Sequence, residues 1–305
     1  IEKVQNGDTR ALLSDPRVLL FALTSGTTAS RKLIPVTDAY LAAYRRGWNM
    51  WGVKMYRDNR GRRIAMRPIV QLGGDPEEFR TPAGIPCGNL SGYTAMVQRR
   101  LIRRMYAVPY VTGKIKDAKS RYYVALRFSI GRNVSQLMAA NPSTLVQLAR
   151  ALDAERDHLL RDLRDGTLRA DLDLTPEVRA YLTPLAKKDA KRAAELGALA
   201  SKLGRLYPKD VWPTEGTVIN TWTGGSMGPY LRQLPEYYGE PPVHDLGLLA
   251  SEGRFTIPLQ GGTASGVLDI WSHYFEFVPE GDVRGWPTPP CWPRGACRTG
   301  RSRCW

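Results

Sequence analysis

The stretch spanning residues 18–38 places the strongest constraint on how this chain can fold. It opens with an apolar run, Val18–Leu23, whose length and composition predict a buried strand. A hydroxyl-rich segment, TSGTTAS, follows at 24–30, and two cations, Arg31 and Lys32, come directly after it. A strand, a small polar loop and cations in this order suit a phosphate ligand, because backbone N–H groups, hydroxyls and a cation can all face phosphate oxygens.

The same loop also has a simpler interpretation. A Walker A loop needs a second glycine directly before a Lys-Ser or Lys-Thr pair, whereas Leu33 follows Lys32 here. A hydroxyl-rich turn after a strand is more often an ordinary turn than an anion site. These residues alone therefore leave a phosphate-binding loop and a plain turn as alternatives.

Composition narrows the class of protein. The chain has 305 residues, enough for a large core, and its 43% hydrophobic and 24% charged residues are typical of a globular protein. No apolar run is long enough to cross a bilayer and no signal peptide opens the chain, so we expect no membrane partner. Three of the four cysteines lie near the C-terminus without zinc-binding spacing, and we expect a cytoplasmic protein without disulfides. Because the first residue is Ile1 and not methionine, we also expect a fragment whose beginning is missing.

The strong positive charge first suggests nucleic-acid binding. The formal net charge is +15 and the sequence pI is about 9.8. The arginines are dispersed, however, and no recognition motif of a nucleic-acid-binding domain is present. The densest cluster, QRRLIRRMY at 98–106, has helical spacing and is better explained as a solvated helix face. We therefore expect no nucleic-acid partner and keep this function only as a minor alternative.

The apolar spacing predicts helices that alternate with short strands. Helices are expected from Thr37, as the N-cap, to Trp51, from Tyr93 to Met105, from Pro142 to the residue before Gly166, from Pro176, and from Pro184. Strands are expected at Ile64–Gln71, at Tyr122–Phe128 and in short segments with glycine turns after Val211. The aromatic side chains of the first helix are predicted to pack in the core. This alternation predicts an α/β fold with a largely parallel sheet.

A second glycine-rich segment, TWTGGSMGPY at Thr221–Tyr230, follows an expected strand. Pro229 suits the first turn of a helix, so Gly224, Gly225 and Ser226 should lie at a carboxyl end of the sheet. Ligands of open α/β sheets bind at such ends, and glycine allows a flat base to approach the backbone closely. These three residues are therefore candidate ligand-binding residues.

The same segment also matches G-x-S-x-G, the nucleophile elbow of α/β-hydrolases. Ser226, Asp269 and His273 occur in the chain order of such a triad and form an alternative interpretation. A triad requires hydrogen-bond contact between the nucleophile and its base, and short matches made of small residues are common by chance. The hydrolase is therefore the second functional hypothesis.

A third segment, LLASEG at Leu248–Gly253, follows another apolar run. Together with TSGTTASRKLIPVT and TWTGGSMGPY, and in the same order, it resembles the auxin-responsive-promoter family of acyl-acid amido synthetases, a branch of the adenylate-forming superfamily. A distal string, YFEFVPEG at Tyr274–Gly281, also resembles this family, so the likeness extends over residues 1–282. We identify the chain as a bacterial-type member of this family. The hydrolase hypothesis, by contrast, leaves the first and third segments unexplained.

The resemblance implies an α/β adenylate-forming (acyl-CoA synthetase-like) fold with layered sheets and flanking helices. Residues 1–282 would be part of the large ATP- and acyl-binding domain. The implied chemistry is ATP-dependent adenylation of a small carboxylic acid, followed by amide formation with an amino acid. The identity of the acid and the amine, and the oligomeric state, stay open.

The resemblance also implies roles for individual residues. The expected phosphate-binding residues are Ser25, Gly26, Thr27, Thr28 and Lys32. Gly224, Gly225 and Ser226 are expected to line the nucleotide, with Ser251 nearby. Glu252 is expected to hold Mg²⁺, because a hard cation prefers carboxylate oxygen, and Lys32 and Glu252 are the expected catalytic residues. The family often has tyrosine at the position of Leu248 as a stacking face for adenine, so we expect apolar packing there.

The last segment, residues 283–305, has no periodicity and no acid, and it is rich in Arg, Pro, Gly, Cys and Trp. That composition is typical of an out-of-frame reading of GC-rich coding sequence, and native tails seldom expose Trp and Cys at this density. The resemblance implies a ribose-binding aspartate and a mobile C-terminal lid, which have no counterpart in the sequence. We therefore expect a tail of non-native appearance, a missing lid domain and an inactive fragment.

Overall fold

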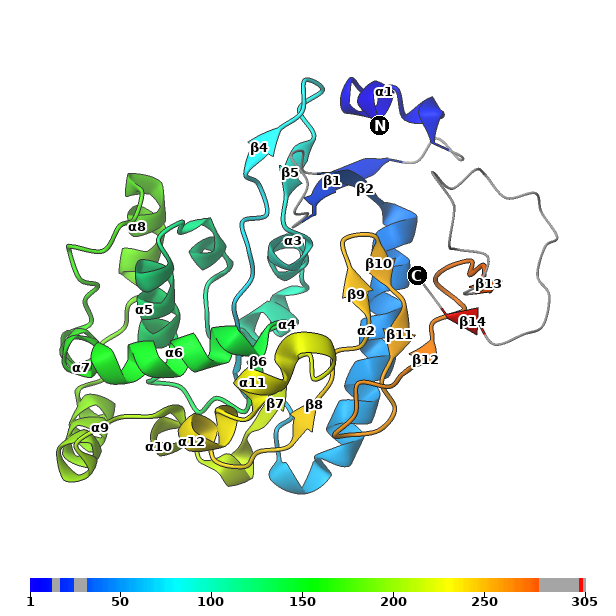
Figure 1. Ribbon diagram of the computed structural model, residues 1–305. Helices are drawn as coiled ribbons and strands as arrows, with labels where there is room; N and C mark the ends of the chain where they lie inside the picture. The colour runs from blue at the N-terminus through cyan, green and yellow to red at the C-terminus, as the bar shows by residue number, and fades with distance from the viewer. Residues whose placement is uncertain (13–16, 25–31, 280–301, 304–305) are drawn as a thin grey trace.

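The computed structural model describes residues 1–12, 17–24, 32–279 and 302–303, and Figure 1 shows their arrangement. A long helix, α2 (Asp38–Asp58), runs along one side of the molecule. The helices between residues 118 and 211 gather at the opposite end, and two four-stranded sheets lie between these parts. The loop at 25–31 and nearly all of the tail at 283–305 fall outside the described residues.

The first sheet has the strand order β2-β1-β5-β4. β1 (Val18–Leu23) and β2 (Leu33–Thr37) are antiparallel, while β5 (Pro86–Gly88) runs parallel to β1 and antiparallel to β4 (Phe79–Arg80). The middle residues of β1 are fully buried, which confirms the predicted strand. The end of β1 and the start of β2 therefore hold the two ends of the hydroxyl-rich loop.

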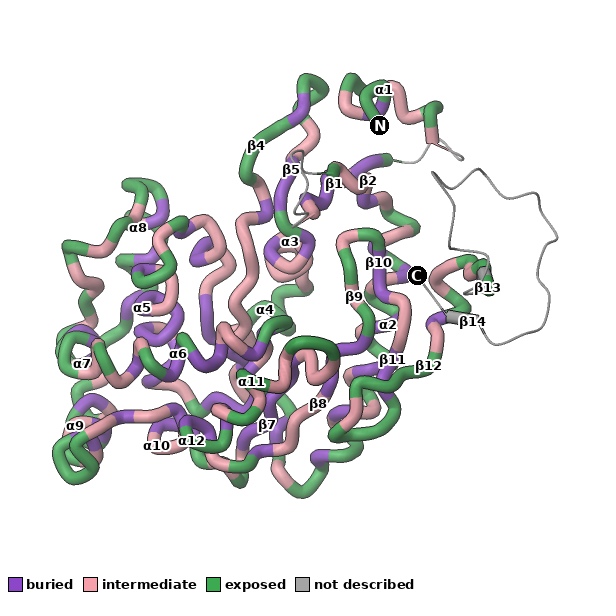
Figure 2. The backbone as a smooth tube through the Cα atoms, viewed as in Figure 1, coloured by how far each residue is buried: buried purple, intermediate pink, exposed green. Residues whose placement is uncertain are grey.

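The second sheet has the order β3-β6-β7-β8 and is parallel throughout. This sheet confirms the expected α/β fold with a parallel sheet. Its strands are β3 (Ile69–Gln71), β6 (Gln136–Met138), β7 (Val218–Asn220) and β8 (Val243–His244). The two central strands are almost wholly buried, as Figure 2 shows, because helices cover them. Parallel strands place their carboxyl ends at one edge of the sheet, and β7 leads from that edge into the segment TWTGGSMGPY.

After β8 the chain forms narrow antiparallel pairs. These are β9 (Leu249–Ala250) with β10 (Gly253–Arg254), β11 (Thr256–Ile257) with β12 (Val267–Leu268), and β13 (Val278–Pro279) with β14 (Ser302–Arg303). β10 and β11 lie against α2, as Figure 1 shows. The pairing of β9 with β10 makes a tight turn of the segment that carries Ser251 and Glu252.

The other helices connect and cover the sheets. They are α1 (Glu2–Gln5), α3 (Leu90–Met96), α4 (Arg100–Met105), α5 (Ala118–Ser129), α6 (Pro142–Ala154), α7 (Arg156–Asp165), α8 (Pro176–Leu182), α9 (Ala190–Leu203), α10 (Pro208–Val211), α11 (Gly228–Leu231) and α12 (Leu234–Tyr238). Single 3₁₀ turns are η1 (Thr9–Ala11), η2 (Arg60–Arg62), η3 (Tyr110–Lys114), η4 (Thr183–Leu185), η5 (Thr214–Gly216) and η6 (Gly225–Met227). Among the described residues, no helix is long and apolar enough to cross a membrane.

Helix α2 begins where the sequence predicts. The Thr37 hydroxyl accepts a 3.1 Å hydrogen bond from the backbone N–H of Tyr40, as an N-cap should. The helix continues past the predicted end at Trp51 to Asp58. It does so because Trp51 and Met55 stay buried against the core, so the apolar face extends further than the aromatic pattern suggested.

The predicted strand at Tyr122–Phe128 is wrong, since these residues belong to α5. Asp117 caps this helix by accepting a 2.7 Å hydrogen bond from the backbone N–H of Ser120. Residues 123–127 are buried on several sides, and this tertiary packing outweighs their preference for β structure.

Other boundaries also differ from the predictions. The helix predicted at 93–105 is divided into α3 and α4, and the one predicted from Pro142 is divided into α6 and α7, ending before Gly166 as expected. The helix predicted from Pro184 begins only at Ala190, as α9, because Asp189 provides its cap by accepting from the backbone N–H of Arg192. The strand predicted at 64–71 is confined to β3.

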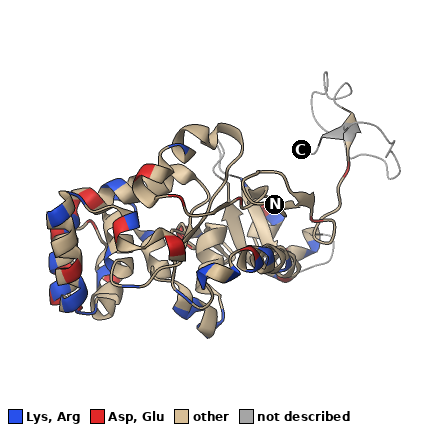
Figure 3. Cartoon of the chain, turned by 90° about the horizontal axis from the view of Figure 1, so that it is seen from below, with Lys and Arg blue, Asp and Glu red and all other residues tan. Residues whose placement is uncertain are grey.

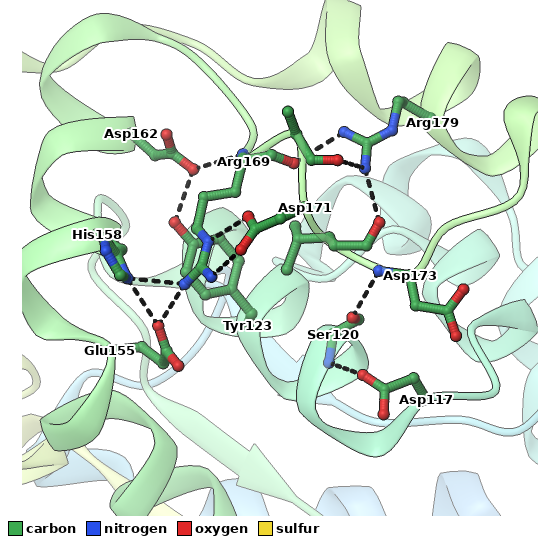
Figure 4. A network of polar contacts seen from close by, with 12 residues as sticks. Asp117, Ser120, Tyr123, Glu155, His158, Asp162, Arg169, Asp171, Asp173 and Arg179 are labelled. Carbon is green, nitrogen blue, oxygen red and sulfur yellow. Dashed lines mark hydrogen bonds and ion pairs between the residues drawn. The ribbon is translucent and has the colours of Figure 1, made fainter.

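A polar network stabilises the helical end of the molecule (Figure 4). The buried Asp162 carboxylate accepts hydrogen bonds from the Tyr123 hydroxyl at 2.7 Å, the Thr167 hydroxyl at 2.7 Å and the backbone N–H of Arg169 at 2.8 Å. The Arg169 side chain in turn pairs with Glu155. Figure 3 shows cations interspersed with acids over this end, which agrees with the dispersed arginines of the sequence.

Candidate functional site

A cavity of about 1810 Å³ lies beside α2, between the two sheets and the β9–β10 turn. It is lined by Lys32 and Glu252, the expected catalytic residues, and by Ser251, which was expected near the nucleotide. Lys32 comes from the start of β2, whereas Ser251 and Glu252 come from the turn after β9. Trp222 of the second segment lines it too. The fold therefore brings residues of all three sequence segments to one cavity, although these segments lie far apart in the chain.

Two hydrogen bonds fix the turn that carries Ser251 and Glu252. The Tyr40 hydroxyl donates to the Ser251 carbonyl at 3.0 Å, and the Ser251 hydroxyl donates to the carbonyl of Leu23 at 3.2 Å. Burial raises the pKa of Tyr40, with further contributions from Tyr44 and Glu252, so its hydroxyl stays protonated as a donor. The turn is thus tied both to the last residue of β1 and to the first turn of α2.

Thr24 and Lys32 close the neck of the hydroxyl-rich loop. The Thr24 backbone N–H donates to the Lys32 carbonyl at 3.3 Å, and the Lys32 backbone N–H donates to the Thr24 hydroxyl at 3.3 Å. Both residues line the cavity. The predicted phosphate-binding residues between them lie outside the described residues: Ser25, Gly26, Thr27 and Thr28. Their assignment stays a prediction.

Aromatic side chains form much of the cavity wall. Tyr44, Trp48 and Trp51 of α2 line it, as does Trp222 after β7. Two of these rings are held by hydrogen bonds, since the ring N–H of Trp51 donates to the carbonyl of Asp245 at 2.8 Å and that of Trp222 to the carbonyl of Gly247 at 2.9 Å. The sequence predicted core packing for the α2 aromatics, and Trp51 is buried in the core; their second role as cavity wall was missed.

Gly224, Gly225 and Ser226 are at the carboxyl end of β7, as predicted, but they do not line this cavity. Gly224 caps the η6 turn, and Gly225 has a φ of 63°, which favours glycine. Their role beside a nucleotide therefore stays a prediction.

Sequence reasoning missed Asp245, which shapes this edge of the sheet. Its buried carboxylate accepts hydrogen bonds from the backbone N–H and hydroxyl of Thr223 at 2.6 and 2.7 Å, and from the backbone N–H of Gly247 at 2.6 Å. Asp245 thereby links the second segment, at Thr223, to Gly247, the residue directly before the third segment. The sequence did offer a signal, because Asp245 is an acid directly after β8, where a parallel strand ends.

The proposed hydrolase triad is not assembled. No hydrogen bond in the described part of the chain joins Ser226 to His273 or to Asp269. Asp269 instead accepts a 2.7 Å hydrogen bond from the Ser272 hydroxyl, and the His273 ring packs 4.9 Å from that of Phe255. Without contact between a nucleophile and a base, this arrangement does not support hydrolase chemistry.

Glu252 is the candidate metal ligand. Within the described ranges, no group of three or more His, Cys, Asp or Glu residues is placed to hold a metal ion by itself. A Mg²⁺ ion bound to nucleotide phosphates needs only one or two protein carboxylates, and Glu252 lines the cavity at the end near Lys32. The donor set therefore fits a nucleotide-bound cation and does not fit a metal cage built by the protein alone.

Comparison with known proteins identifies the family. A model of the GH3 family N-terminal domain matches residues 1–243. Jasmonoyl--L-amino acid synthetase JAR6 of Nicotiana attenuata is 23% identical, over 92% of this chain and 50% of the relative. Indole-3-acetic acid-amido synthetase GH3.10 of Arabidopsis thaliana is 22% identical, over 92% of this chain and 49% of the relative. The chain thus spans about half the length of the curated relatives it matches.

The fold has solved counterparts. The structure of AtGH3.15 acyl acid amido synthetase in complex with 2,4-DB superposes with a TM-score of 0.74 at 19% identity, over 92% of this chain and 50% of that one. A second structure, GH3.15 acyl acid amido synthetase, gives a TM-score of 0.67 at 18% identity, over 85% and 45%. This likeness confirms the adenylate-forming α/β fold. With the family model covering most of its residues, the chain belongs to the GH3 family.

Proposed function

We propose that this chain provides the ATP- and acid-binding part of an ATP-dependent acyl-acid amido synthetase. The observation that carries the proposal is the meeting of Lys32, Ser251 and Glu252 at one end of a large, partly aromatic cavity. The names of the relatives, which are amido synthetases for jasmonic and indole-3-acetic acid, support the same reaction class. Residues 1–282 would form part of the large domain of such an enzyme.

In the first step, a carboxylate oxygen of the acid attacks the α-phosphorus of ATP. The bond between the α-phosphorus and the bridging oxygen breaks, and pyrophosphate leaves with that electron pair. Negative charge accumulates on the phosphate oxygens during this displacement, so a positive side chain near them lowers the barrier. Lys32, together with the hydroxyls and backbone of Ser25, Gly26, Thr27 and Thr28, would supply that environment.

Glu252 would contribute a carboxylate oxygen to Mg²⁺ on the α-phosphate side. When bound, Mg²⁺ neutralises phosphate charge. Ser251 would keep the turn in place through its bond to Leu23, and Gly224, Gly225 and Ser226 would lie along the nucleotide. None of these side chains acts as a covalent nucleophile, so the rate enhancement would come from positioning and charge neutralisation.

In the second step, the amine of an amino acid attacks the acyl carbon of the adenylate. The new C–N bond forms as the bond between carbon and the phosphate oxygen breaks, AMP departs, and the amine loses a proton. The partners are therefore a small carboxylic acid and an amino acid, with ATP and Mg²⁺. We place this reaction in the cytoplasm, in a bacterial-type enzyme that has no nucleic-acid partner.

Binding of MgATP to the purified chain tests the proposal. We expect Lys32→Ala to weaken binding by about tenfold or more, since a hydrogen bond to a charged group contributes about 1.5–3 kcal/mol. Lys191→Ala, on α9 outside the cavity lining, is the matched control and should bind like the wild type. In a longer chain that spans the full length of the relatives, ATP–pyrophosphate exchange over a panel of carboxylic acids then reports the first step. Absence of MgATP binding by the wild type, or equal affinity in Lys32→Ala, would contradict the assignment.

A further inference from the structure

The cavity lining carries an excess of positive charge. Its cationic residues are Lys32, Arg45, Arg57, Arg60, Arg63 and Arg99. Glu252 is the one carboxylate residue among the described residues of the lining. None of these side chains takes part in an ion pair within the described part of the chain. A partly enclosed cavity with unpaired cations attracts anions and raises their local concentration.

Three of the arginines gather where α2 ends, and we call them the arginine end. Arg57 lies in the last turn of the helix, and Arg60 and Arg63 belong to the η2 turn and its C-cap. The nearest acid in sequence, Asp58, pairs with Lys54 instead. Among the described residues, the three exposed guanidinium groups have no ion-pair partner, so they can bind an anion at this end of the cavity.

The backbone beside the arginine end is held in an unusual conformation. Arg63 has a φ of 49° and Met66 a φ of 61°, and both line the cavity. In the described ranges, no other residue except glycine has a positive φ. Left-handed backbone is unfavourable for side chains of this size and is retained mainly where a site requires it. The strained backbone at Arg63 and Met66 therefore supports a functional role for this wall of the cavity.

The arginine end lies far from Lys32 and Glu252. The turn carrying Glu252 is tied to Tyr40 at the start of α2, whereas Arg57 lies in its last turn. From Tyr40 to Arg57 the helix rises about 25 Å. Between the two ends the lining is largely apolar, with Trp48 and Met55 among its members. The cavity, at about 1810 Å³, also exceeds the ordinary range of ligand pockets, which is roughly 300–1,000 Å³.

We propose that the acid bound by this cavity is a long α,ω-dicarboxylic acid, whose reacting carboxylate lies near Lys32 and Glu252 and whose second carboxylate is held by Arg57, Arg60 and Arg63. The inference rests on the proposed function and adds the class of acid to it. Arginine suits this role because its planar guanidinium binds a carboxylate through two parallel hydrogen bonds. The apolar middle of the acid would lie along Trp48 and Met55.

The amino-acid substrate does not account for the arginine end. Its amine must reach the activated acyl carbon near Glu252, and an amino acid is much shorter than the distance from there to Arg57. A monocarboxylic acid of any length would leave the arginine end without an anion. A second carboxylate on the acid satisfies both ends at once.

The test compares three acids of equal chain length in the purified chain. Binding of hexadecanedioic acid, ω-hydroxyhexadecanoic acid and palmitic acid is followed by tryptophan fluorescence, below their micellar concentrations, since Trp48 and Trp51 line the cavity. We expect the dicarboxylic acid to bind about tenfold tighter than the other two. Suberic acid, which is too short to reach both ends, should lose most of this advantage.

Arginine variants locate the second carboxylate. The triple substitution Arg57→Gln, Arg60→Gln and Arg63→Gln should abolish the preference for the dicarboxylic acid over palmitic acid. The control substitutes Arg100→Gln, Arg103→Gln and Arg104→Gln on α4, which removes the same charge from exposed residues outside the cavity lining. This control should retain the preference.

The remaining outcomes overturn the inference in distinct ways. Equal binding of the dicarboxylic and monocarboxylic acids would refute the second carboxylate site while leaving the proposed function intact. A preference that survives the arginine triple substitution would refute the assigned residues. If MgATP binds and no long acid binds, the class of acid is wrong; if MgATP also fails to bind, the proposed function itself fails.

Discussion

The Tyr40 hydroxyl donates a 3.0 Å hydrogen bond to the Ser251 carbonyl, across 211 residues of sequence. Tyr40 stands in the first turn of the helix that follows the hydroxyl-rich loop, and Ser251 precedes Glu252 in the turn after β9. This single contact therefore couples the loop expected to bind phosphate to the carboxylate expected to bind Mg²⁺. The bond between the Ser251 hydroxyl and Leu23 strengthens the same coupling from the other side.

Removal of the Tyr40 hydroxyl should loosen the turn without disturbing the ring packing. In Tyr40→Phe we expect the free energy of unfolding to fall by only about 1 kcal/mol, the usual net contribution of one hydrogen bond. The affinity for MgATP should fall several-fold, because Glu252 is no longer held toward the phosphates. Isothermal titration with MgATP and denaturant unfolding separate the two effects. Tyr274→Phe, at a residue 84% exposed, is the control, and an unchanged MgATP affinity in Tyr40→Phe would refute the coupling.

The buried Asp162 should be important for stability alone. It accepts three hydrogen bonds, one of them from the fixed backbone N–H of Arg169, so an amide at this position must turn its NH₂ toward at least one donor. We expect Asp162→Asn to lower the free energy of unfolding by about 2–3 kcal/mol. Asp157→Asn on the same helix, with a side chain 90% exposed, should change it by less than about 0.5 kcal/mol.

Denaturant unfolding of both variants provides the measurement. The network around Asp162 lies at the helical end of the molecule and contributes no residue to the cavity lining. MgATP binding by folded Asp162→Asn should therefore match that of the wild type. Equal stability of the two asparagine variants would show that the network of Figure 4 does not stabilise the fold.

The sequence predicted those helices and strands whose conformation is set by neighbouring residues, and it failed where contacts with distant residues set the conformation. β1 and the start of α2 were predictable because an apolar run and the Thr37 cap act over a few residues. The helix α5 was not, since burial among distant elements decides its conformation against local preference. Local signals thus gave the elements around the loop more reliably than those in the core.

The residues of the candidate site also fall into predicted and missed ones. Lys32 and Glu252 were named from motifs that resemble a family, and the fold places both on one cavity. Asp245 and the arginine end were missed because their roles appear only when β8, α2 and the cavity are seen together. A side chain that supports a site through contacts with a distant segment belongs to no local motif, so the sequence alone does not reveal its role.

His244 should make stability depend on pH. Burial lowers the pKa of this histidine below its ordinary value of 6.5, and its Nε2 lies 2.7 Å from the Asn59 amide nitrogen, which donates to the neutral ring. The unfolded chain therefore binds a proton more readily than the folded one. The part of the free energy of unfolding that depends on neutral His244 should be fully present above pH 6.5 and should be lost as the pH drops below that value.

Unfolding of the wild type and His244→Gln between about pH 5 and 8 tests this assignment. The glutamine variant lacks the titrating group, so its free energy of unfolding should change less across this range. Tyr274→Phe, at an exposed position, controls for a substitution elsewhere and should keep the slope of the wild type. Parallel curves for wild type and His244→Gln would show that another group causes the pH dependence.

Two glycines of α2 should respond to alanine with opposite sign. A Cβ at Gly47 would lie 2.6 Å from the Cδ atom of Arg254 and 3.0 Å from the Oδ2 atom of Asp269, whereas one at Gly52 would meet no atom within 4 Å. Arg254 is fully buried, stacks 4.6 Å from the Trp48 ring and donates to the Leu246 carbonyl at 2.7 Å, so it has little room to move.

We therefore expect Gly52→Ala to raise the free energy of unfolding by about 0.5–1 kcal/mol, because alanine is the better helix former. Gly47→Ala gains the same helix preference but must displace Arg254, and we expect a net loss of about 1–3 kcal/mol. Denaturant unfolding of the two single variants measures the difference directly. Similar gains in both would mean that Arg254 can move away from α2 and make room for a methyl group at position 47.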